Sequence, residues 1–98
     1  MIMKIYDKAS WHIDANEPEK DVVERFDKIM QWCNTHNLLN EEGKEILALG
    51  IDDSISLHSQ MFTTDGNKFM CWLFETDHIP YTVSFEEMEN ELSKIMHQ

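Results

Sequence analysis

The chain of 98 residues is long enough for one domain but not for two, because independent cores typically need about 50–200 residues. Its 19 Asp and Glu outnumber its 8 Lys and Arg. The resulting net charge of −11 makes nucleic acid and anionic membranes poor partners, since both are bound through clustered basic side chains. Because 42% of the residues are apolar, the sequence predicts one folded domain over residues 1–98 rather than a disordered chain.

The cysteine content and the N-terminal residues predict a cytoplasmic protein. Cys33 and Cys71 are too few for the disulfide framework of a small secreted domain. The opening residues become charged at Lys4, which is too early for the apolar run of a signal peptide. No stretch reaches the roughly 18 consecutive apolar residues of a membrane span.

The first 16 residues contain a pattern with a period of two. After a short apolar start, the apolar Ala9, Trp11 and Ile13 alternate with polar side chains. This alternation predicts a short strand or an extended arm laid on the core.

The first helix is predicted from about residue 18 to 35. Asn16 can cap it, Pro18 suits its opening turn, and the acidic residues that follow favour the positive end of the helix dipole. Its apolar residues recur at i, i+4, i+7 and i+11 and predict one wide buried stripe. The stripe consists of Val22, Phe26, Ile29 and Cys33, broadened by Val23 and Met30.

A short second helix is predicted to begin in the capped acidic segment Asn40-Glu41-Glu42 and to end at Gly50. We expect Ile46, Leu47 and Leu49 to be its buried residues. The apolar residues between 51 and 62 fit a strand and a helical turn equally well, so both alternatives stay open there.

Two further helices complete a mainly α fold of about four helices, or an α+β fold if the N-terminal segment is a strand. The turn over residues 63–66 caps a third helix of about 65–76, which is apolar on nearly all sides and therefore belongs in the core or at an interface. We expect it to end at Ile79-Pro80-Tyr81. Residues 84–87 match a capping box in which a serine and a glutamate satisfy each other's backbone donors. They predict a last helix to about residue 96, with the buried stripe Phe85, Met88, Leu92 and Ile95.

Several residue pairs have spacings that can support chemistry. Cys33 and His36 stand three apart, as metal ligands can, with Cys71 and His78 as further ligands. However, Cys33 lies on the apolar stripe, where a thiol serves as a small core residue. Neither a nucleophile elbow nor a phosphate loop is present. We therefore predict no metal, no cofactor and no catalytic residue.

Trp11 and His12 lie in a heptad, Tyr6 to His12, that falls outside the strong helical patterns. The tryptophan either pins a terminal arm to the core or anchors an interface. This heptad resembles the opening Tyr-Asp-x-Ala-Ser-Trp-His of a family of small, uncharacterised bacterial proteins, and the stretches 39–43 and 64–69 look like that family as well. Some of its members resemble immunity proteins that neutralise polymorphic toxins in the same cytoplasm, and the resemblance implies that role here.

The functional hypothesis is a non-catalytic, protein-binding domain, in the form of an immunity protein that covers a basic toxin by charge mimicry. Two alternatives stay open: a homo-oligomeric structural protein, such as a homodimer through the third helix, and a hydrolase that uses Ser10 and His12. We expect the partner to contact six side chains, Trp11, His12, Asp14, Glu17, Asp52 and Asp53.

Overall fold

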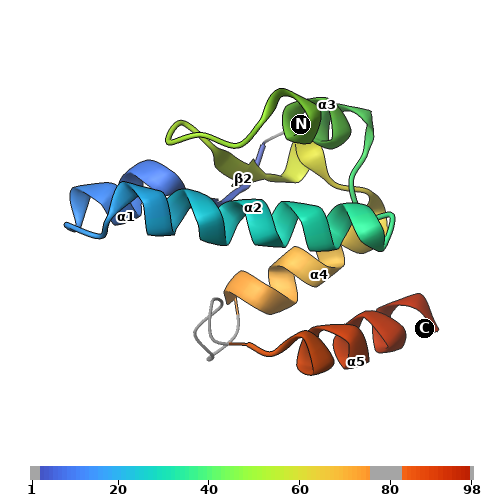
Figure 1. The fold of residues 1–98 in the computed structure, drawn as a ribbon. Coiled ribbons are helices and arrows are strands. Elements are labelled where there is room, and N and C mark those ends of the chain that lie inside the picture. Colours follow the sequence, from blue (N-terminus) through green and yellow to red (C-terminus); the bar gives the residue numbers. More distant parts are fainter. Residues whose placement is uncertain (1–2, 76–82, 98) are drawn as a thin grey trace.

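The computed structural model describes residues 3–75 and 83–97, and it is mainly helical with one short pair of strands (Figure 1). The predicted fold class, mainly α with a short N-terminal strand, is therefore confirmed. In chain order the elements are β1 (Ile5–Lys8), α1 (Ala9–Asp14), α2 (Glu19–Thr35), α3 (Glu41–Leu49), β2 (Ser56–His58), the 3-10 turn η1 (Ser59–Met61), α4 (Thr64–Glu75) and α5 (Phe85–Met96).

Helix α2 crosses the middle of the molecule, with α3 and the strands on one side and α4 and α5 on the other (Figure 1). The predicted stripe is what anchors it: Val22, Phe26, Met30 and Cys33 are completely buried. Helix α4 closes the core from below with Phe69, and the Trp32 ring of α2 stacks on that ring at 4.8 Å between centroids. Full burial of a Val, Phe or Met side chain is worth about 1.5–3 kcal/mol, so these contacts contribute substantially to the stability.

The remaining core residues come from every part of the described chain. Helix α4 contributes Met70 and Leu73 besides Phe69, whereas its Trp72 and Phe74 are half-buried. The C-terminal helix lies on α4 with three buried residues, Met88, Leu92 and Ile95.

Residues 51–62 contain both of the structures that the sequence allowed. The strand β2 pairs antiparallel with β1, with Leu57 opposite Asp7, and the chain then turns through η1. The segment after η1 runs beside the segment after α2: Asn40 N donates to Met61 O at 3.0 Å, and Thr63 N donates to Leu38 O at 2.9 Å. Thr63 also caps α4, because its Oγ1 accepts from Gly66 N at 3.1 Å, as predicted.

The period-two prediction for residues 9–14 is wrong, since they form the helix α1 rather than a strand or an extended arm. In a helix, residues two apart point in nearly opposite directions, so Ala9 is buried while Trp11 is 53% exposed. The predicted cap at Asn16 is also wrong. Asn16 takes a left-handed turn with φ 70°, and Pro18 precedes the first turn of α2 without any side-chain cap.

Two predicted core residues, Leu49 and Phe85, are exposed by 88% and 60%. Each is the terminal residue of its helix. The neighbouring element covers the other apolar residues of that helix but does not extend to its end. The serine half of the predicted capping box is present, with Ser84 Oγ accepting from Glu87 N at 3.2 Å. Residue 76, His78 and the predicted break at 79–81 lie outside the described residues.

Gly43 and Gly66 allow two backbone segments to approach closely. A Cβ at Gly43 would press on the carbonyl oxygen of Met61, and one at Gly66 would press on that of Leu38. Alanine in place of glycine in a helix normally stabilises by up to about 1 kcal/mol. Here we expect Gly43→Ala and Gly66→Ala each to lower the free energy of unfolding by about 1–3 kcal/mol, measured by urea denaturation.

Lys44→Ala, at an exposed position of the same helix as Gly43, is the control and should change that free energy by less than about 0.5 kcal/mol. A stabilised glycine variant would show that the two segments have room to separate.

Candidate functional site

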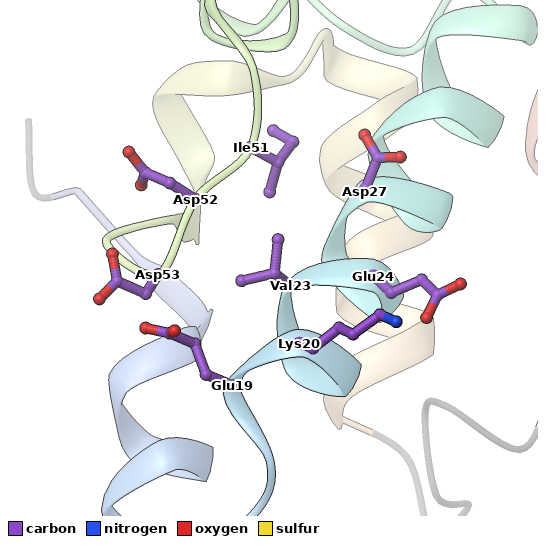
Figure 2. A pocket seen from close by; sticks show the side chains of 8 residues that line it. All are labelled: Glu19, Lys20, Val23, Glu24, Asp27, Ile51, Asp52 and Asp53. Atoms are coloured by element: carbon purple, nitrogen blue, oxygen red, sulfur yellow. The ribbon is translucent and has the colours of Figure 1, made fainter.

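An open groove of about 610 Å³ lies between α2 and the loop that follows α3 (Figure 2). Its floor is apolar and its rim is acidic. The lining residues are Glu19, Lys20, Val23, Glu24 and Asp27 from α2, and Ile51, Asp52 and Asp53 from the loop. Five of these eight side chains are carboxylates and one is basic.

The α2 wall follows from helical spacing. Glu19, Val23 and Asp27 stand four residues apart, so they share the face of α2 that adjoins the buried stripe. Figure 2 shows Val23 and Ile51 projecting towards each other across the groove. Both are half-buried, which leaves an apolar surface that a partner can still cover.

The loop wall is held by a tight turn. Asp52 Oδ1 accepts hydrogen bonds from the backbone N of Ser54 at 2.9 Å and from its hydroxyl at 2.5 Å. These hydrogen bonds lower the pKa of the Asp52 carboxyl, so it stays charged at neutral pH. The exposed Asp53 follows in this loop, and Figure 2 shows Glu19, at the start of α2, extending towards it.

Glu19 and Asp53 bring two carboxyl groups together at one end of the groove. Asp53 raises the pKa of Glu19, because a hydrogen bond between two carboxyl groups requires a proton on one of them and because two adjacent carboxylates repel each other when both are charged. A cation placed at this end would relieve that repulsion. The groove therefore suits a side chain with an apolar stem and a positive head, which is the chemistry of arginine and lysine.

A second cluster of charged groups lies at α1. The two ring nitrogens of His12 contact Asp7 Oδ2 at 2.7 Å and Glu17 Oε2 at 2.6 Å, and Arg25 donates to the other oxygen of Glu17 at 2.8 Å. Burial acts to lower the pKa of His12, but the hydrogen bonds to the two carboxylates outweigh it and raise that pKa. We call these four residues the His12 cluster.

The six predicted partner-binding residues fall into three places. Asp52 and Asp53 lie in the groove, while His12 and Glu17 are joined in the His12 cluster. Trp11 and Asp14 lie on the exposed surface of α1. The Trp11 ring does not pin an arm to the core, since it is half exposed and has the Lys8 ammonium 5.8 Å from its centroid.

The α2 wall of the groove was not predicted from the sequence. The helical spacing places Val23 in the buried stripe, whereas it lines the groove together with Glu19, Glu24 and Asp27. The signal in the sequence is that acidic residues, Glu19 and Asp27, lie four positions before and four positions after Val23. That spacing identifies a helix face, but it does not reveal which loop lies opposite.

The geometry at His12 does not match the hydrolase alternative. A hydrolase that uses Ser10 and His12 needs both side chains on one face, but in the helix α1 they lie on nearly opposite sides. Ser10 is exposed, and both ring nitrogens of His12 face carboxylates rather than the hydroxyl.

Cys33 belongs to the core. It is completely buried, and burial raises its pKa to about 12, so the thiol stays neutral. The His36 ring packs on Trp32 at 4.3 Å between centroids. Residues 3–75 and 83–97 contain no group of three or more His, Cys, Asp or Glu side chains arranged to hold a metal ion.

The protein is thus a small, acidic, mainly helical protein with an open acidic groove between a helix and a loop. No protein-family model, curated protein or solved structure matches the chain. In the part of the chain that the structure describes, no helix is long and apolar enough to cross a membrane.

The buried position of Cys33 predicts its reactivity. Because only the thiolate is nucleophilic, we expect iodoacetamide at mildly alkaline pH to leave Cys33 unmodified in the folded protein and to alkylate it in urea. Peptide mass spectrometry measures both states. Rapid alkylation of Cys33 in the folded protein would contradict its assignment to the core.

Proposed function

We propose that this protein is a non-catalytic domain that binds a basic protein partner in its acidic groove. The observation that carries the proposal is the composition of the groove, five carboxylates and one lysine around the apolar Val23 and Ile51. Basic side chains from a partner would place their stems on the apolar floor and their charged heads among the carboxylates.

The charge of the whole chain supports the same proposal. A net charge of −11 attracts a basic partner over distances of about a Debye length, roughly 8–10 Å at physiological salt, and accelerates the encounter. Exposed ion pairs are individually worth only about 0–1 kcal/mol, so affinity must come from the apolar floor and from several pairs acting together. The groove supplies both in one place.

We propose that the partner is a toxin and that the chain acts as its immunity protein. This assignment is supported by the resemblance of the segment Tyr6 to His12 to a family in which some members resemble such proteins. It is also supported by charge, since toxins that attack nucleic acid are often basic and an acidic protein can cover their substrate site. Inhibition would then be stoichiometric and would take place in the cytoplasm.

The groove can be tested with a model ligand. We expect an alternating Ala-Arg octapeptide to bind at low salt and to weaken as salt is added, because the attraction is electrostatic. Replacing Asp52 and Asp53 by lysine should weaken binding about tenfold, which corresponds to about 1.4 kcal/mol, as measured by isothermal titration calorimetry. Replacing Glu24 and Asp27 by lysine should have a similar effect from the opposite wall.

The matched control changes Glu86 and Glu87 to lysine, which alters the net charge equally but on the exposed start of α5. We expect this control to weaken binding by less than about twofold. A peptide with citrulline in place of arginine keeps the shape without the charge and should not bind. Equal losses in the groove variants and the α5 control would show that the peptide responds only to net charge, and the groove would then be the wrong surface.

A further inference from the structure

Helix α1 needs a source of stability beyond its own residues. It has six residues, far fewer than the roughly 12–15 at which isolated helices become even marginal in water. No side chain caps its N-terminus, and Ala9 is its one fully buried residue, with Ile13 half-buried. Its most extensive polar contacts are those of His12.

His12 connects α1 with the segment before it and with the segment after it. One nitrogen contacts Asp7 in β1, five residues before, and the other contacts Glu17 in the turn to α2, five residues after. Asp7 is only 8% exposed, and its other oxygen accepts from Lys8 N at 2.8 Å. Arg25 of α2 holds the second oxygen of Glu17.

This geometry requires a particular protonation state. Ionised carboxylates only accept hydrogen bonds, so an imidazole that bonds two of them must donate from both nitrogens and is therefore an imidazolium. A neutral imidazole donates from one nitrogen and presents a lone pair at the other. The lone pair would then face a carboxylate oxygen, and one of the two ties would be lost.

We propose that α1 is a proton-controlled latch: protonated His12 closes residues 9–17 onto β1 and α2, and loss of the proton opens this segment while the α2 core stays folded. Among residues 3–75 and 83–97, the charged groups that face His12 are Asp7 of β1 and Glu17 of the turn, and Arg25 of α2 in turn contacts Glu17. The Phe26 ring, 6.0 Å from the imidazole, provides an apolar neighbour. The closed latch presents Trp11 and Asp14, which are exposed on α1. None of the side chains of the His12 cluster lines the groove.

The direction of the pH dependence follows from linkage. The pKa of His12 is raised in the folded state, so the stabilisation is complete below the usual value of about 6.5 and is lost as the pH rises through the higher folded value. The latch therefore opens on the alkaline side. The core residues Phe26 and Met30 do not titrate, and they hold α2 in place throughout.

Amide hydrogen exchange from about pH 5 to about pH 9, corrected for the intrinsic exchange rate, tests the latch. We expect the protection of residues 9–17 to fall about tenfold or more as His12 deprotonates, with the midpoint of the His12 ring titration in the NMR spectrum. The protection of Phe26 and Met30 should stay constant. His12→Gln should leave residues 9–17 weakly protected at every pH, and Glu17→Gln should shift the midpoint to lower pH.

His36→Gln is the control, since it removes another partly buried histidine and should leave the transition intact. Constant protection of residues 9–17 across the pH range would overturn the latch. A simultaneous loss of protection at Phe26 would also overturn it, because the transition would then be global unfolding. Persistence of the transition in His12→Gln would assign it to a different group.

Discussion

The structure depends on the division of α2 into two faces. The inward face carries the completely buried side chains Val22, Phe26 and Met30. Helices α1 and α3 pack on α2, and the Trp32 ring of α2 stacks on Phe69 of α4. The adjoining face carries Glu19, Val23 and Asp27 and forms one wall of the groove. Because the inward face fixes the rotation of the helix, it also fixes which carboxylates meet the loop at residues 51–53.

Local patterns in the sequence were sufficient for most of the helical fold. The caps at Asn40 and Ser84 involve residues three positions apart, and the apolar stripe of α2 repeats every three to four residues. Residue spacing alone is therefore enough to predict them. Helix α1 was missed because its period-two pattern looks extended, and its main polar contacts run from His12 to Asp7 and Glu17, which lie outside the helix. Such contacts have no periodic signature.

The groove could be only half predicted for a related reason. Asp52 and Asp53 can be recognised in the sequence as an acidic pair, but the opposite wall belongs to a helix about thirty residues earlier. The contact between the two segments depends on tertiary packing, which places Ile51 opposite Val23 (Figure 2). Leu49 was assigned to the core and is exposed instead, since its helix ends where the covering elements end.

Charge and shape together connect the fold with the proposed function. A uniformly acidic surface would attract basic molecules everywhere, whereas a groove with an apolar floor concentrates both the electrostatic and the apolar contributions. The arrangement uses no buried charge, so the carboxylates remain hydrated and available until a partner arrives. In addition, the protonation of His12 would control whether α1 is closed or open, without disturbing the α2 core.

The central claim is that the groove, rather than the acidic surface as a whole, receives the basic partner. Backbone amide chemical shifts recorded during titration with the Ala-Arg octapeptide test this claim most directly. The account predicts that the shifts concentrate in residues 19–27 and 51–53 and saturate together with one affinity. Shifts spread evenly over the acidic surface, including the start of α5 at residues 85–87, would contradict it.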